Sequence, residues 1–259
     1  MTGVAALRMY DLDEVRAPCE QLWSAVASRL DDAPRELTWT GAPGVEWSDP
    51  DLVLGQTCGW PLVTDLRDAV TVVGAFDYDI AGADGRPQYG SVLVASEARP
   101  LDAFRNTVAA VNGTDSLSGW VSLGVAVADA ARPAPFFSRL VETGSHRASV
   151  EAVRSGDAAL ASIDAVSWAL LERHVPSLTR GLVVVGNGPT VPTLPLITAA
   201  PDPEPLRDAL DAALADPATA DSRAVLLING FHRLDLSSYE ALVRLGPVAS
   251  ETLGCRAHG

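Results

Sequence analysis

The chain of 259 residues contains no lysine, so apart from four histidines all of its basic side chains are arginines. Without lysine there is no Schiff-base nucleophile and no phosphate-binding lysine of a P-loop. Acidic residues outnumber arginines 33 to 19, which gives a formal net charge of −14. Nucleic acids and anionic membranes both attract clustered cations, so neither is expected as a partner.

Cysteine and histidine are also scarce. The three cysteines, Cys19, Cys58 and Cys255, are widely spaced without a CxxC pair, and the histidines form no HExxH motif. This pattern argues against a disulfide framework, a zinc site or another transition-metal site, and no cofactor is expected. No apolar run approaches the ~20 residues that a membrane-spanning helix needs, so direct membrane insertion is not expected.

The first residues contain no recognisable secretory signal. Residues 1–8 lack a basic segment followed by a long apolar stretch and a small-residue cleavage site. The sequence as it stands therefore predicts a cytoplasmic protein. A periplasmic or cell-surface location is the alternative if the natural N-terminus has been truncated.

Short β-branched runs alternate with amphipathic stretches, which is typical of α/β proteins with parallel sheets and crossover helices. A helix should begin after the first strand, with Asp11 as its N-cap in capping-box spacing to Glu14. The expected strands are 4–10, 51–56, 70–76, 89–95, 107–111, 136–143, 158–163 and 181–186. After Pro201 the composition predicts only helices, over 204–215, 217–228 and 237–245.

Two extended segments, near 87–95 and 188–198, separate the middle of the chain from both ends. If both are crossovers, residues 89–188 form a second lobe inserted into a first lobe of residues 1–88. Residues 189–259 then return to the first lobe and add the C-terminal helices. Such an arrangement predicts a ligand cleft between two α/β lobes.

The strongest local signal is the segment 108–120, in which an apolar strand leads through a serine- and glycine-containing turn into a helix. The first amides of a helix lack internal partners and carry partial positive charge, so they can hold an oxyanion. Thr114, Ser116, Ser118 and Gly119 are the candidate residues. The alternative interpretation is that Asp115 or Ser116 only caps the helix.

The segment 143–153 repeats this arrangement, with Ser145 as the expected cap of a second helix and His146 beside it. Both turns should open on the same edge of one lobe. His146 is a candidate ligand donor; the alternative is an ordinary surface histidine. No convincing set of catalytic residues accompanies it.

Three further strand ends carry candidate residues. The strand before Pro61 ends in Gln56 and Thr57 and is followed by Trp60, and ligands of open α/β sheets bind beyond such ends. Tyr10 ends the first strand. Asp164 ends another, where it could accept hydrogen bonds from a ligand amine or simply cap the next helix.

In this order, four pieces resemble the phosphonate-binding family of ABC-importer solute-binding proteins, in a short divergent branch. They are residues 9–11, 49–64, 112–119 and 144–164. The resemblance implies the type II periplasmic-binding-protein fold, with the phosphonate group on Thr114, Ser116, Ser118 and Gly119. It places the acidic residue that meets a ligand amine at Asp164. The family usually has a tyrosine where this chain has Trp60.

The leading hypothesis is a solute-binding protein, not an enzyme, for a small anionic metabolite of phosphonate or phosphate type. It would act as a monomer and serve an ABC permease. The alternatives are a cytoplasmic enzyme on the same fold, with His146 or Asp164 as acid or base, and a cytoplasmic ligand sensor.

Overall fold

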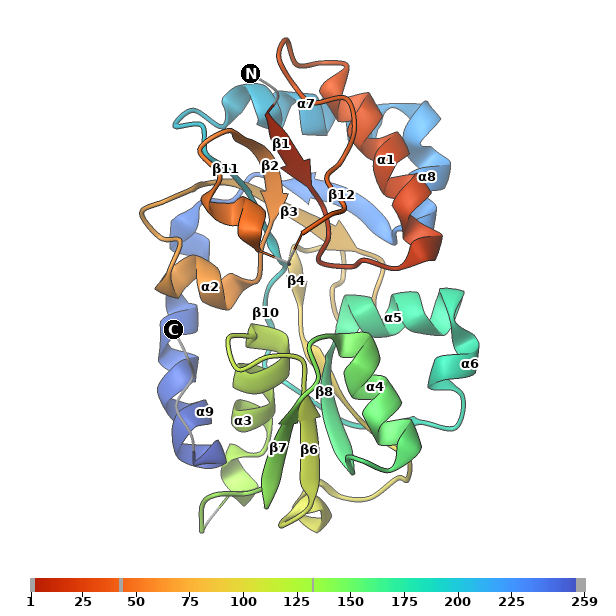
Figure 1. Cartoon of the computed structure of the whole chain (residues 1–259), viewed down its shortest axis with the longest axis vertical. Coiled ribbons are helices and arrows are strands. Elements are labelled where there is room, and N and C mark those ends of the chain that lie inside the picture. The colour runs from red at the N-terminus through yellow and green to blue at the C-terminus, as the bar shows by residue number, and fades with distance from the viewer. Residues whose placement is uncertain (1–2, 42–43, 132, 255–259) are drawn as a thin grey trace. The chain divides into compact units, whose positions relative to one another are not determined.

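The computed structural model describes residues 3–41, 44–131 and 133–254 (Figure 1). The chain divides into two compact units. Unit 1 comprises Met1–Gln88 and Pro192–Glu240, and unit 2 comprises Tyr89–Val191 and Ala241–Gly259. Cys255 and one of the four histidines, His258, lie outside the described residues.

Unit 1 is built on a five-stranded sheet in the order β1-β2-β11-β3-β12. Its strands are β1 (Val4–Ala6), β2 (Leu52–Gln56), β3 (Thr71–Tyr78), β11 (Pro195–Thr198) and β12 (Ile228–His232). β1 and β2 are parallel, whereas β11 is antiparallel to both β2 and β3, and β12 is antiparallel to β3. The sheet is therefore mixed, because β11 and β12 belong to a part of the chain that returns to unit 1 after an excursion through unit 2.

The helices of unit 1 are α1 (Asp13–Ala27), α2 (Gly59–Thr64), α7 (Glu204–Ala215) and α8 (Ala220–Val225). α1 buries Val15, Cys19, Leu22, Trp23 and Val26 on one side and contacts α7 and α8. The predicted cap is wrong: Leu12 occupies the N-cap position without a side-chain cap. Asp11 instead accepts a hydrogen bond of 2.7 Å from Nε of Arg16, because that guanidinium lies within reach one turn into the helix.

The prediction of an exclusively helical end is wrong as well. Residues 217–228 form a short 3-10 turn (Pro217–Thr219) and α8, and then Leu227 takes a left-handed φ of 59°. That residue ends the helical path and lets Ile228 start β12, in which Phe231 pairs with Phe76 of β3. The partner strand lies some 150 residues earlier in the chain, so nothing local in the sequence announces the pairing.

Unit 2 has its own five-stranded sheet, in the order β7-β6-β8-β5-β9. The strands are β5 (Ser91–Ala95), β6 (Val108–Val111), β7 (Arg139–Glu142), β8 (Leu160–Asp164) and β9 (Val183–Asn187). β6 is parallel to β7 and β8, whereas β5 is antiparallel to β8 and β9. The helices are α3 (Ser122–Ala126), α4 (His146–Ser155), α5 (Ala165–His174), α6 (Pro176–Thr179) and α9 (Leu245–Leu253).

Short strands mark the two predicted crossovers: β4 (Gln88–Tyr89) and β10 (Val191–Pro192) pair as a separate two-stranded sheet. The sequence predicted that the chain from residue 189 to its end belongs to the first lobe. The structure instead places Ala241–Gly259 in unit 2. The reason is close packing of α9 on α3: a Cβ at Gly124 would lie only 2.5 Å from the Cα of Ala249.

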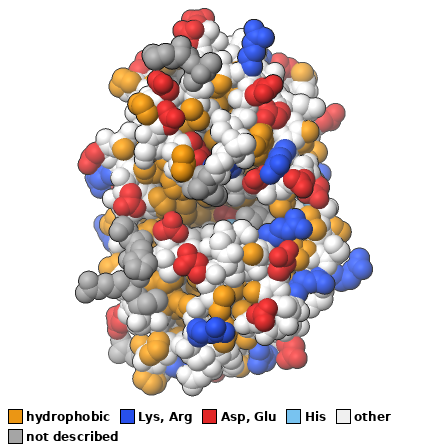
Figure 2. Space-filling model, in the orientation of Figure 1, with side chains coloured by type: hydrophobic (Ala, Val, Ile, Leu, Met, Phe, Trp, Pro, Cys, Tyr) orange, Lys and Arg blue, Asp and Glu red, His pale blue; other side chains and the backbone are white. Residues whose placement is uncertain are grey.

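No helix among the described residues is long and apolar enough to cross a membrane. On the face shown in Figure 2, acidic side chains are scattered among arginines and apolar side chains. The charged side chains on this face are therefore interspersed rather than collected in one patch (Figure 2).

Candidate anion-binding site

The candidate site of unit 2 begins where β6 ends. After Val111 the chain turns, and Ser116 caps a π-helical turn, Leu117–Val121, that continues directly into α3. The Ser116 hydroxyl accepts a hydrogen bond of 3.0 Å from the amide of Gly119. The capping role that the sequence allowed for Ser116 is thus present. Turns of the π type are rare and occur frequently at functional sites.

The second serine turn lies beside the first, because β6 and β7 are parallel neighbours and Val111 pairs with Glu142. Ser145 caps α4 by accepting a hydrogen bond of 3.1 Å from the amide of Ala148, as predicted. His146, the first residue of α4, brings its Nε2 to 2.8 Å from the Ser118 hydroxyl. The hydroxyls of Ser116 and Ser118 are themselves 3.4 Å apart.

Burial lowers the pKa of His146 to about 4. The imidazole is therefore neutral near pH 7, so one ring nitrogen can donate a hydrogen bond and the other can accept one. The donor between Ser118 and His146 depends on the imidazole tautomer. The cluster of Ser116, Ser118 and His146 consequently offers hydrogen bonds without a net positive charge.

The turn packs closely around Gly119, which is buried. A Cβ at Gly119 would overlap Oδ1 of Asn112 and would lie 3.2 Å from the Ser116 hydroxyl, so a larger residue there would displace the Asn112 side chain. Thr114 lies half-buried in the turn that leads to Ser116. Of the four candidate ligand contacts in this loop, Thr114 has the least support from the structure.

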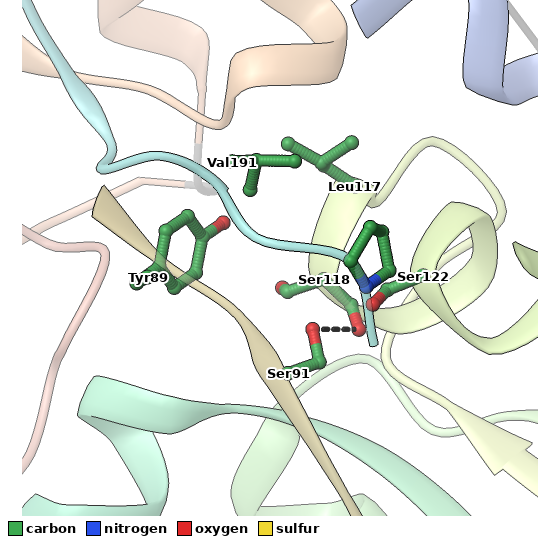
Figure 3. Close-up of a pocket in the computed structure, with 7 residues that line it drawn as sticks. Tyr89, Ser91, Leu117, Ser118, Ser122 and Val191 are labelled. Carbon is green, nitrogen blue, oxygen red and sulfur yellow. Dashed lines mark hydrogen bonds between the residues drawn. The ribbon is translucent and has the colours of Figure 1, made fainter. Parts of the chain in front are cut away.

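Next to the turn lies a small pocket, which Tyr89, Ser91, Leu117, Ser118, Ser122, Pro189 and Val191 line (Figure 3). All seven side chains are uncharged. The hydroxyl of Ser91 donates a hydrogen bond of 2.8 Å to the backbone carbonyl of Ser118, drawn as a dashed line in Figure 3. Tyr89, Ser91 and Ser122 were not predicted, because nothing local sets them apart from other strand and helix residues.

Asp164 occupies the start of α5, where its Oδ1 accepts hydrogen bonds of 2.8 Å from the amide of Val166 and 2.9 Å from that of Ser167. Its side chain is buried. The structure thus shows the capping role that the sequence left open. The binding of a ligand amine stays a prediction, and the engagement of Oδ1 in the cap weighs against it.

Two of the four candidates in unit 1, Tyr10 and Gln56, lie against Tyr78. The amide of Gln56 donates a hydrogen bond of 3.1 Å to the Tyr78 hydroxyl, and the ring of Tyr10 lies edge-on to that of Tyr78 at 5.6 Å. Thr57 is fully buried. Trp60 is buried on α2, and its indole nitrogen has no hydrogen-bond partner among the described residues. An unpaired buried N–H is costly, which keeps Trp60 a candidate ligand donor.

Metal ligation finds no support in the side chains. Among the residues that the structure describes, no group of three or more His, Cys, Asp or Glu side chains could hold a metal ion.

A family model for the periplasmic substrate-binding proteins of phosphonate ABC transporters matches residues 54–242, most of the chain. The chain belongs to this family. It is therefore a solute-binding protein of a transport family whose members work in the periplasm, with a small ligand and a permease as partners. A comparison of this binding protein with curated protein sequences gives no match.

Solved structures share the fold of the binding protein over nearly its whole length. PhnD1 from Prochlorococcus marinus, solved with methylphosphonate, covers 96% of this chain and 98% of its own, with 15% identity and a TM-score of 0.76. The binding-protein component PA3383 of a phosphonate transporter from Pseudomonas aeruginosa covers 96% and 86%, with 17% identity and a TM-score of 0.74. XAC2383 from Xanthomonas citri, solved with ATP, covers 91% and 94%, with 16% identity and a TM-score of 0.65. These likenesses confirm the predicted type II periplasmic-binding-protein fold.

Proposed function

We propose that this binding protein holds a small tetrahedral oxyanion, such as methylphosphonate, on the turn Ser116–Gly119 of unit 2. The observation that carries the proposal is the contact of 2.8 Å between the Ser118 hydroxyl and Nε2 of His146, at the start of a helical segment. Two neighbouring capped helix starts supply amides and hydroxyls at one sheet edge. PhnD1, which shares the fold, is solved with methylphosphonate.

Neutral donors suit such a ligand because the first amides of a helix act as a fixed partial positive charge. In a low-dielectric site each hydrogen bond to an anion is worth roughly 1.5–3 kcal/mol. The Ser118 hydroxyl and the His146 imidazole can both turn toward the anion, since each has a second hydrogen-bonding direction. Of the predicted contacts in unit 2, Ser116, Ser118, Gly119 and His146 are the ones that the structure brings together.

A serine beside a histidine also fits a nucleophile and its general base, and this favours an enzyme as the second candidate. The low pKa of His146, about 4, opposes that role, because a general base works best with a pKa near the operating pH. Asp164, the other candidate acid or base, is engaged in capping α5. We therefore propose binding without turnover: methylphosphonate recovered after incubation should be unchanged in its ³¹P spectrum.

Calorimetric titration tests the proposal, with methylphosphonate, phosphate and acetate as ligands. The wild type should bind methylphosphonate, and Ser118→Ala should weaken binding about 10- to 100-fold, because a hydrogen bond to a charged group is lost. Ser222→Ala is the matched control: Ser222 is a buried serine of unit 1 whose hydroxyl donates to Oε1 of Gln21 at 2.7 Å. Failure of the wild type to bind any of these anions at millimolar concentration would overturn the proposal.

Transport adds two further expectations to the proposal. The loaded binding protein should be monomeric, which size-exclusion chromatography with light scattering measures directly. It should also dock on the permease of its transporter in the periplasm, rather than act as a cytoplasmic sensor. Stimulation of the ATPase activity of the reconstituted transporter by the loaded protein would separate these two roles.

A further inference from the structure

In the turn Ser116–Gly119, the peptide unit between Ser118 and Gly119 makes hydrogen bonds with three serine hydroxyls. Its N–H donates to the hydroxyl of Ser116 at 3.0 Å. Its carbonyl accepts a hydrogen bond of 2.8 Å from Ser91 and another of 2.6 Å from Ser162. Ser91 lies on β5 and Ser162 on β8, which are antiparallel neighbours, so both hydroxyls approach the carbonyl from one sheet.

The π-helical turn explains why this carbonyl is available to side chains. In an α-helix the amide of Ser122 would bond to the carbonyl of Ser118, four residues earlier. Here the Ser122 amide bonds to the carbonyls of Leu117 and Gly119 instead. The Ser118 carbonyl therefore accepts no hydrogen bond from the Ser122 amide. It accepts from the hydroxyls of Ser91 and Ser162 instead.

Both strand serines are buried. Ser91 is 3% exposed and Ser162 is completely buried, and each donates its hydroxyl to the same oxygen. Buried hydroxyls cost free energy unless they are paired, and the interior of a strand is more commonly filled by apolar side chains. Two buried serines that meet on one backbone oxygen therefore indicate a requirement for a fixed orientation of that peptide.

We propose that Ser91 and Ser162 are positioning residues of the ligand site. By holding the Ser118 carbonyl they set the rotation of the Ser118–Gly119 peptide, and with it the direction of the Ser118 hydroxyl that faces His146. A peptide held in advance loses no conformational freedom when the anion arrives, so the two serines raise affinity without touching the ligand. This inference rests on the proposed function, because the two serines position a peptide for an anion proposed to bind at Ser116–Gly119.

The test compares Ser91→Ala and Ser162→Ala in the full chain with Ser222→Ala, which also removes one buried serine hydrogen bond but does so in unit 1. Each strand variant should bind methylphosphonate about tenfold more weakly, whereas the control should bind like the wild type. The three variants should have similarly lowered midpoints of thermal unfolding. Should Ser162→Ala fail to fold, Ser91→Ala, which alters a residue of the pocket wall, carries the same comparison.

A second measurement reports on the turn without ligand. The ¹⁵N shift of Nε2 of His146 senses its hydrogen bond with Ser118, and it should move in both strand variants and stay constant in the control. Binding and shifts that match the control in both strand variants would overturn the positioning role. If the wild type binds no methylphosphonate, the proposed function fails, and the imidazole shift then decides separately whether the strand serines orient the turn.

Discussion

At the scale of single residues, the chemistry of the site depends on His146 being neutral. An imidazolium next to Ser118 would lose part of its hydration, and burial accordingly lowers the pKa of His146 to about 4. A neutral ring can accept from or donate to the Ser118 hydroxyl, so the pair can reorganise when an anion arrives. A permanent charge would fix the pair in one arrangement.

The same pKa predicts how stability depends on pH. In the unfolded chain His146 has an ordinary pKa of about 6.5, so the folded state, whose pKa is lower, binds fewer protons. Its contribution is fully present above pH ~6.5 and is lost as the pH falls toward 4. Between about pH 7.5 and about pH 5 the wild type should lose about 2 kcal/mol more stability than His146→Gln, whose side chain does not titrate.

Urea unfolding of both proteins at each pH measures this difference, because all other titrating groups are common to the two. Parallel loss of stability in the wild type and in His146→Gln would contradict the assigned pKa.

At the scale of elements, Asp164 caps α5 and is also the predicted contact of a ligand amine. Its Oδ1 accepts from two amides at the start of α5. Asp164→Ala should therefore lower the free energy of unfolding by about 1–2 kcal/mol, whereas Asp164→Asn, which keeps an acceptor, should retain most of it. Chemical denaturation measures both.

Ligand binding by the same pair of variants separates the cap from amine recognition. If Asp164 only caps α5, Asp164→Asn will bind methylphosphonate and 2-aminoethylphosphonate with the same ratio of affinities as the wild type. A selective loss of the amine-bearing ligand would instead assign the amine contact to Asp164.

Elements with a strong local signal could be predicted from the sequence. α7 has the predicted limits, 204–215, because its buried residues Leu206, Ala209, Leu210, Ala213 and Leu214 recur at helical spacing. β12 could not be predicted, because Ile228–His232 has no alternating pattern and forms a strand only through pairing with β3. Ser116, Ser118 and His146 were predicted from their helix starts, and the structure brings them together. Ser91 and Ser162 were not predicted. The feature that they share is a hydrogen bond to the Ser118 carbonyl oxygen, and only the folded chain brings that oxygen to them.

At the scale of the whole molecule, a chain with a net charge of −14 is proposed to bind an anion. The seven residues that line the pocket beside Ser118 are uncharged, so no ion pair there offsets the long-range repulsion. Hydrogen bonds at short range must therefore supply the affinity, while the charge of the molecule acts against it at long range. The two contributions respond differently to salt, since screening acts mainly on separated, exposed charges.

Raising the ionic strength from about 0.01 M to about 1 M shortens the Debye length from ~30 Å to ~3 Å. We expect this change to leave the Kd for methylphosphonate unchanged or to lower it slightly, because screening removes the repulsion and leaves the buried hydrogen bonds intact. Calorimetric titrations in sodium chloride and in sodium nitrate separate screening from competition, because screening depends only on ionic strength and competition depends on which anion is present. A steep rise in Kd, equal in both salts, would mean that cations hold the ligand and would place its site away from Ser118.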